Sequence, residues 1–112
     1  MKIIIKITNL ELTPAINKYI EEKIGSLDKF LSKKFEKDGE IKIDIEIART
    51  TKHHKSGNVF YAEATMRLGS KVLRAENSGP DLRASVDIIK DTLRQSIQKH
   101  KEVIIEKKRT IR

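Results

Sequence analysis

The feature that most constrains the fold is a strict alternation of isoleucine and charged residues in the segment EIKIDIEIAR, residues 40–49. Because successive side chains of a β-strand point to opposite faces, this period of two gathers all the isoleucines on one face. That face carries Ile41, Ile43, Ile45 and Ile47, and the other carries Glu40, Lys42, Asp44 and Glu46. The segment therefore predicts a strand with one face in a core and the other in water.

Three further segments fit strands. In residues 2–7, Ile3, Ile5 and Ile7 alternate with Lys2, Ile4 and Lys6. In residues 58–68, Phe60, Ala62, Ala64, Met66 and Leu68 alternate with Tyr61, Glu63, Thr65 and Arg67. The pair Gly69-Ser70 predicts a tight hairpin turn, which leads into a short strand at residues 71–76.

Two segments follow the helical period instead. Thr13 and Pro14 predict the start of the first helix, because threonine is a good N-cap and proline is preferred at the first helical position. Its apolar stripe predicts one helix to about residue 31 and comprises Ile16, Tyr19, Ile20, Ile24, Leu27 and Leu31. After a turn at residues 77–82, a long helix is expected near Pro80, with Asp81 in its first turn, where the helix dipole favours a carboxylate. Its stripe comprises Leu82, Val86, Ile89, Leu93, Ile97, His100 and Ile104.

The order of these elements, β-α-β-β-β-α, predicts the α+β class and a two-layer sandwich. Both helices should pack on one face of a four-stranded sheet, in the manner of a double-stranded-RNA-binding domain. The other sheet face carries charges of both signs and should be solvated. We expect a single domain at residues 1–106 and a basic C-terminal tail at residues 107–112.

Charge and composition narrow the classes of function. The chain has 112 residues, a formal net charge of +8 and a pI of about 9.8, which is the electrostatic footprint of a nucleic-acid binder. Aromatic residues make up only 4%, which counts against stacking many bases on rings. The absence of cysteine excludes disulfides, cysteine-based zinc sites and thiol nucleophiles. No apolar run approaches the roughly 20 residues that span a bilayer, so we expect a cytoplasmic location and no membrane partner.

A group of cations lies in and beside the segment TKHHKSG, residues 51–57. It comprises Arg49, Lys52, His53, His54 and Lys55. Such a loop at a hairpin tip is either a phosphate contact or a solvated loop, and the loop alone leaves both alternatives open. Adjacent residues on a strand point to opposite faces, and structural zinc usually needs four ligands, so His53 and His54 are poor candidates for a metal site. We expect no metal and no other cofactor.

Catalytic motifs are absent from the sequence. There is no G-x-S-x-G elbow, no glycine-rich phosphate loop and no evident nucleophile beside a base. His100 falls in the apolar stripe of the last helix, where a histidine at the edge of the core is expected. The chain is therefore not expected to be an enzyme or to take a small-molecule substrate. A metal protein or enzyme built on His53, His54 and His100 remains an alternative.

The last helix carries a basic ridge, formed by Arg83, Lys90, Arg94 and Lys101. At 3.6 residues per turn these four residues share one narrow sector beside the apolar stripe, with Asp87 and Gln98 on its border. Lys99 lies on another flank. A row of cations on a helix is usually a solvated face, but it is also how a helix follows a phosphate backbone. On the first helix, Lys23 falls inside the apolar stripe, as expected of a lysine whose stem covers the core edge.

Three stretches of the sequence resemble a known family over essentially the whole chain. The stretch LRAENSGPDLRASVD, followed by KHK, resembles the last part of the ribosome hibernation-promoting factors, also called ribosome-associated translation inhibitors. The stretch INKYIEEKIGSLDKF resembles the first helix of that family, and TKHHKSGNVFYAEATMRL resembles the loop and strand of some members. The resemblance is to the short form, without the C-terminal dimerisation domain of the long form.

The resemblance implies binding to rRNA of the small ribosomal subunit, and to neighbouring ribosomal proteins, in the channel that mRNA and tRNA occupy, with inhibition of translation. The rRNA-binding residues that it implies are Lys23, Lys29, Arg83, Lys90, Lys99 and Lys101, and helix geometry alone adds Arg94. Family members often have basic residues at positions where this chain has Ser26, Thr92 and Gln95. A general double-stranded-RNA-binding module is the alternative function. The sequence leaves the oligomeric state open, with a monomer favoured.

Overall fold

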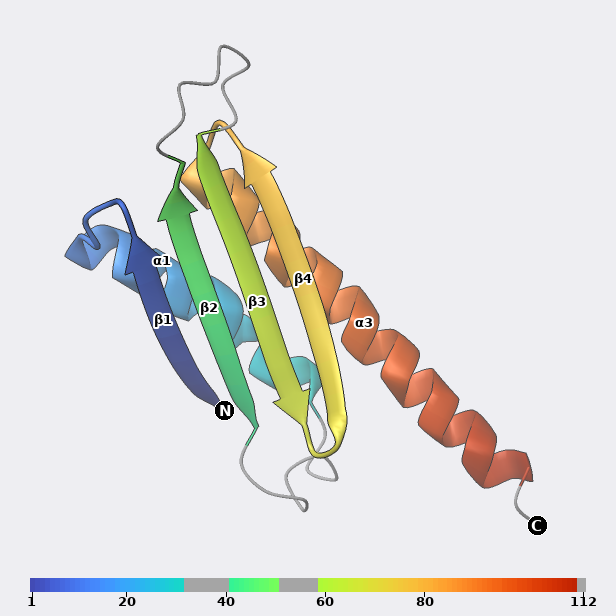
Figure 1. The fold of residues 1–112 in the computed structure, drawn as a ribbon. Helices are drawn as coiled ribbons and strands as arrows, with labels where there is room; N and C mark the ends of the chain where they lie inside the picture. Colours follow the sequence, from blue (N-terminus) through green and yellow to red (C-terminus); the bar gives the residue numbers. More distant parts are fainter. Residues whose placement is uncertain (32–40, 51–58, 111–112) are drawn as a thin grey trace.

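A computed structural model describes the backbone of residues 1–31, 41–50 and 59–110, and side chains as far as residue 103. Its elements are β1 (Lys2–Thr8), α1 (Pro14–Gly25), the 3₁₀ helix η1 (Ser26–Phe30), β2 (Lys42–Arg49), β3 (Phe60–Leu68), β4 (Lys71–Gly79) and α3 (Leu82–Thr110). The strands form one sheet in the order β1-β2-β3-β4 (Figure 1). This arrangement confirms the predicted α+β class and element order.

Sheet pairing follows from how the strands are connected. β1 and β2 are parallel, with Ile3 opposite Ile43, because the chain between them crosses over through α1. The pairs β2–β3 and β3–β4 are antiparallel. Leu68 pairs with Lys71 across a two-residue turn, and Gly69 there has φ 60°, a conformation that glycine adopts without steric cost. The predicted hairpin turn is therefore confirmed.

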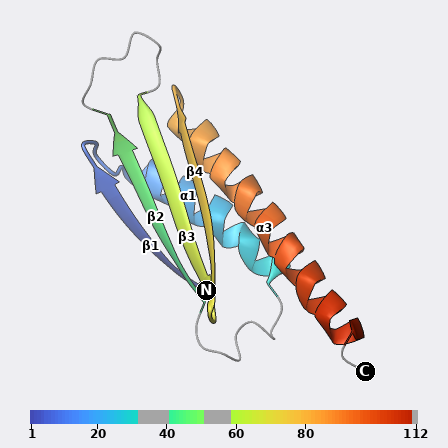
Figure 2. The ribbon, with the colours of Figure 1, turned by 45° about the vertical axis from the view of Figure 1, so that its right-hand side comes forward.

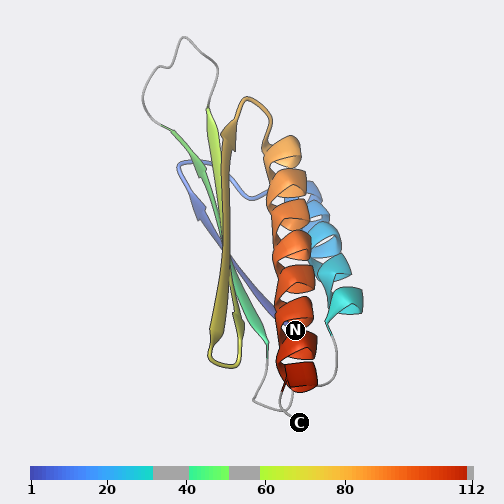
Figure 3. The same ribbon diagram turned by 90° about the vertical axis from the view of Figure 1, so that its right-hand side faces the viewer.

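Both helices lie on the same face of the sheet, which makes two layers (Figure 3). α1 and η1 run alongside α3 in the helical layer (Figure 2). The core between the layers contains the predicted isoleucines of β2, the predicted apolar residues of β3 from Ala62 to Leu68, and the α3 stripe from Leu82 to Ile97. β1 lies at the sheet edge, so its inward isoleucines are only half-buried. His100 is also half-buried, as expected at the core edge.

The first helix ends earlier than the apolar stripe predicted. α1 stops at Gly25, and residues 26–30 form the 3₁₀ helix η1 rather than a continuation to Leu31. Glycine has low helix propensity, and the Ser26 hydroxyl donates a 2.6 Å hydrogen bond to the carbonyl of Lys23, which satisfies a backbone acceptor at the helix end. The tighter turn still keeps Leu27 fully buried. Thr13 caps the start of α1 as predicted, because its hydroxyl accepts the backbone N–H of Ile16.

The connection into α3 also differs from the prediction. β4 continues to Gly79, which pairs with Phe60, so residues 77–79 belong to the strand and not to a turn. Asp81 lies just before α3 instead of in its first turn: its Oδ1 accepts the backbone N–H groups of Arg83 (2.9 Å) and Ala84 (3.4 Å). Asp81 therefore caps the helix directly, and its charge also faces the positive end of the helix dipole.

Candidate nucleic-acid interface

The basic ridge runs along α3, and its first member, Arg83, lies beside Tyr19 of α1. Its members are Arg83, Lys90, Arg94 and Lys101. Eighteen residues of helix separate the first from the last, which is about 27 Å at 1.5 Å per residue. Arg83 and Arg94 are exposed, whereas Lys90 and Lys101 are half-buried. One continuous helix thus holds four cations in a straight row.

Lys23 of α1 approaches the first member of the ridge through Tyr19. The Tyr19 hydroxyl donates a 2.7 Å hydrogen bond to Oδ1 of Asp87 on α3, which links the two helices. The Lys23 ammonium lies 3.9 Å from the same carboxylate oxygen and 5.5 Å from the centroid of the Tyr19 ring. The Arg83 guanidinium lies 5.1 Å from that centroid. Two cations from different helices therefore lie against one aromatic ring, at distances typical of cation–π contacts.

The surroundings of Tyr19 keep its hydroxyl protonated. Burial raises the pKa of Tyr19 to about 12, and the hydrogen bond to the Asp87 carboxylate adds to the effect. The hydroxyl is therefore a proton donor throughout the physiological range. Sequence reasoning placed Tyr19 in the apolar stripe and Asp87 at the ridge border, but it missed the bond between them. The signal available was a tyrosine, which has a polar end, at the edge of a helix stripe.

The other two predicted contact residues lie apart from the ridge. Lys29 is exposed on η1, which packs against α3, and its ammonium lies 5.3 Å from the Phe30 ring centroid. Lys99 is on the opposite flank of α3, where it lines a groove against β4 together with Lys71, Ser96 and His100. Lys29 thus shares the helical layer with the ridge, whereas Lys99 faces away from it.

Of the predicted loop cations, only Arg49 lies in the described residues. It is exposed at the end of β2, in the row Arg49–Phe60–Gly79 across the sheet, at the same end of the domain as the start of α3. Lys52, His53, His54 and Lys55 lie outside the described residues. The metal or catalytic alternative built on His53, His54 and His100 therefore has two of its three residues outside them. Across residues 1–31, 41–50 and 59–103, no three His, Asp or Glu side chains gather as a metal site would require.

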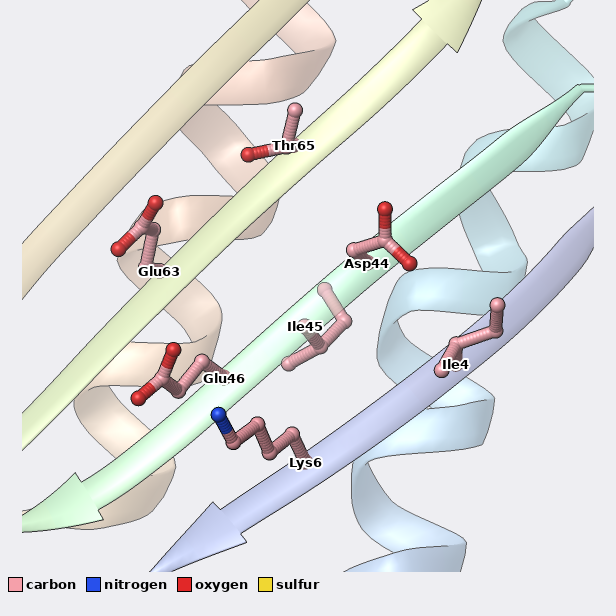
Figure 4. Close-up of a pocket in the computed structure, with 7 residues that line it drawn as sticks. All are labelled: Ile4, Lys6, Asp44, Ile45, Glu46, Glu63 and Thr65. Carbon is pink, nitrogen blue, oxygen red and sulfur yellow. The ribbon is translucent and has the colours of Figure 1, made fainter.

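The outer face of the sheet has a different electrostatic character. Four residues in register form one row across the strands: Lys6, Glu46, Glu63 and Glu76. A shallow hollow beside this row contains three carboxylates and a single lysine (Figure 4). The Arg74 guanidinium, 2.7 Å from Glu63, holds the pKa of that carboxyl below its ordinary range. This row is poorly suited to a polyanion, although the same face also carries Lys2, Lys42 and Arg67 in register. The helical layer, with its row of cations along one helix, is therefore the better candidate interface.

Tyr61 contacts two glutamates of this row. Its hydroxyl lies 3.0 Å from Glu63 and 2.9 Å from Glu76, and burial together with these carboxylates raises its pKa. Three glutamates directly opposite one another would repel, and the hydroxyl and the guanidinium offset that repulsion.

In the part of the chain that the structure describes, no helix is long and apolar enough to cross a membrane.

The fold and the charge distribution define an α+β domain with a basic helical layer. The chain belongs to the Ribosomal S30AE family, described as sigma 54 modulation protein / S30EA ribosomal protein, whose pattern matches residues 3–104. The resemblance noted in the sequence is thereby confirmed. Membership in this family also supports the expectation that the chain is not an enzyme.

Two curated relatives are both named ribosome hibernation promotion factor. The protein of Staphylococcus aureus is 34% identical over 101 residues, which cover 90% of this chain and 48% of the relative. The protein of Lactococcus lactis subsp. cremoris is 30% identical over 93 residues, which cover 83% and 45%. The chain therefore spans about half the length of these relatives.

Solved structures agree with the fold. The N-terminal domain of Thermus thermophilus Protein Y is 29% identical, with a TM-score of 0.69 and coverage of 89% of this chain and 99% of that one. A ribosomal subunit interface protein from Coxiella burnetii has a TM-score of 0.68 at 18% identity, covering 91% and 99%, and this second likeness supports the fold alone.

Proposed function

We propose that this chain is a ribosome hibernation factor that binds rRNA of the small ribosomal subunit in the mRNA and tRNA channel and so inhibits translation. The observation that carries the proposal is the straight row of cations on α3, with Lys23 of α1 brought beside its first member. Family membership and the names of the relatives support a ribosomal target in the cytoplasm.

A rigid basic ridge suits this target physically. Structured RNA is recognised mainly through its shape and through contacts to phosphates and 2′-hydroxyls, because its deep major groove hides the base edges. Such contacts need fixed cations more than they need aromatic platforms. The described side chains provide cations at fixed spacing on α3, and the chain has an aromatic content of only 4%. Shape-directed binding to folded rRNA therefore fits better than the reading of a single-stranded sequence.

The test is co-sedimentation of the protein with small ribosomal subunits on sucrose gradients at several salt concentrations, with duplex RNA as competitor. Each phosphate contact should contribute roughly −0.7 to −0.9 to the slope of log affinity against log salt. Saturable one-to-one binding that survives the competitor, together with inhibition of a translation extract, supports the proposal. If duplex RNA competes fully, the protein is a general duplex-binding module and the ribosomal target is wrong.

The interface itself is tested by charge reversal. Replacing Lys90, Arg94 and Lys101 together by Glu should abolish subunit binding with the fold intact, because three adjacent contacts become repulsive. The matched control reverses a row on the outer sheet face, Lys2, Lys42 and Arg67, which changes the net charge equally. The control should retain most of the affinity. Equal loss in both variants would show that net charge, and not the ridge, drives binding.

A further inference from the structure

Asp87 is out of place on a surface proposed to bind phosphate. It lies on α3 between ridge members Arg83 and Lys90, and its side chain is 44% exposed. A carboxylate in this position repels an incoming phosphate. Asp91, one turn further along α3, is 57% exposed and lies 3.7 Å from the Lys90 ammonium. The two carboxylates carry the same charge on the same helix, but Asp87 bonds to Tyr19 of α1, whereas Asp91 pairs with Lys90 of its own helix.

Asp87 contacts one cation of the interface directly and a second through Tyr19. It accepts the Tyr19 hydroxyl at 2.7 Å and lies 3.9 Å from the Lys23 ammonium. Tyr19 in turn presents its ring to Lys23 and Arg83. The backbone N–H of Arg83 is fixed separately by the Asp81 cap. Asp87 and Tyr19 thus bridge the two helices at the place where cations from both helices meet.

We infer that Tyr19 and Asp87 are positioning residues that hold Lys23 and Arg83 as a two-cation clamp for the phosphate backbone of RNA. This inference rests on the proposed function. Lysine and arginine side chains lose much rotamer freedom when they bind, so holding them beforehand increases affinity. A clamp drawn from two helices also requires the helices to keep a fixed separation, which the Tyr19–Asp87 hydrogen bond provides. The favourable effect of positioning outweighs the repulsion from one carboxylate that is already paired.

The decisive experiment compares Asp87→Asn with Asp91→Asn, because each removes one negative charge from α3. Binding is measured to small ribosomal subunits and, separately, to a short RNA duplex, across a series of salt concentrations. Charge alone predicts that both variants bind more tightly. The clamp predicts that Asp87→Asn binds roughly three- to tenfold more weakly, the loss expected when one or two polar contacts are removed. Asp91→Asn should bind as tightly as the wild type or more tightly.

The salt slope separates positioning from mere folding. If Lys23 no longer reaches its phosphate, the slope of log affinity against log salt becomes shallower by about 0.7 to 0.9. A variant that is only less stable has fewer folded molecules but the same slope. Tyr19→Phe keeps the ring and loses the hydroxyl, so it should reproduce the weaker binding of Asp87→Asn. Thermal unfolding of each variant confirms that binding is measured on folded protein.

The outcomes are distinct. Unchanged or tighter binding by Asp87→Asn refutes the clamp, as does weaker binding with an unchanged slope or an equal loss in Asp91→Asn. If the wild type binds the duplex but not the subunit, the ribosomal target fails while the duplex data still decide the clamp. If the wild type binds neither RNA, both proposals are wrong.

Discussion

Truncation of Leu93 tests which side of α3 packs on the sheet. The position of the ridge depends on that orientation. Leu93 is fully buried, in the middle of the apolar stripe of α3. Replacing a fully buried leucine by alanine removes its transfer free energy and leaves a cavity, at a cost of about 2 to 5 kcal/mol. A domain of this length has a free energy of unfolding of roughly 6 to 17 kcal/mol, so the loss is a large fraction of the total. The variant should still fold, but the midpoint of its unfolding transition should be clearly lower.

The expected change in melting temperature follows from the size of the domain. An unfolding entropy of about 2.1 cal/mol/K per residue gives roughly 0.24 kcal/mol/K for this chain. A loss of about 3 kcal/mol then lowers the Tm by about 13 °C. Thermal unfolding followed by circular dichroism measures this shift, and urea unfolding checks it through the midpoint at constant slope.

The matched control is the neighbouring position. Thr92 is exposed, about 100° around the helix from Leu93, and alanine is a better helix former than threonine. Thr92→Ala should therefore change the stability by no more than about 0.5 kcal/mol, and in the stabilising direction. If Leu93→Ala costs less than about 1 kcal/mol, or no more than the Thr92 control, α3 does not face the sheet as described, and the position of the ridge is wrong with it.

Three further predictions concern a helix cap, an ion pair and two cations of α3. Asp81→Ala should lower stability by about 1 kcal/mol in urea unfolding, because it removes the helix cap, and Asp81→Asn should restore most of the loss. The pKa of Glu63 is held below its ordinary value near 4.5, so its contribution to stability is present above that pH and is lost as the pH falls through the lower, folded-state value. Glu63→Gln should therefore cost more stability at pH 7 than at a pH well below 4.5, measured as urea midpoints. Equal costs at both pH values would contradict the pairing with Arg74. Arg94→Ala and Lys99→Ala, which lie on different flanks of α3, should weaken RNA binding additively in a double variant, and strong coupling would place them at one contact.

The strands and the fold class could be predicted because their signal is local. Alternation of apolar and polar residues records which face of a strand is buried. β2 buries its predicted isoleucines, and β3 buries its predicted residues from Ala62 to Leu68, while Phe60 is half-buried. Where two local signals competed, the prediction failed. The apolar stripe continued to Leu31, while Gly25 and Ser26 favoured an end to the helix. The α-helix ends at Gly25, as these two residues favour. β4 extends beyond its alternating pattern because pairing with β3 satisfies its backbone groups up to Gly79.

The cations of the candidate site could be predicted, but their relation to one another could not. Helical spacing alone placed the ridge on one side of α3. The Tyr19–Asp87 bond joins residues 68 positions apart, and no local pattern records a contact of that separation. The direction of Lys99 was visible from helical spacing, but the groove against β4 that it lines depends on tertiary packing.

Net charge alone does not locate the interface. The excess of cations in the sequence is spread over both layers, and α3 itself carries three acidic residues between 82 and 103. Each of them has a partner: Asp87 has Tyr19 and Lys23, Asp91 lies 3.7 Å from Lys90, and Glu102 accepts a 3.4 Å hydrogen bond from Gln98. Since exposed charges are screened over about 8 Å at physiological salt, a phosphate responds to the nearest groups and not to the total. Along the ridge the cations nearest to a bound phosphate would be its members, Arg83, Lys90, Arg94 and Lys101. The order of charges along one helix, together with the pairing of its carboxylates, is therefore our reason for proposing this side of the domain as the RNA interface, in preference to the glutamate row on the outer sheet face.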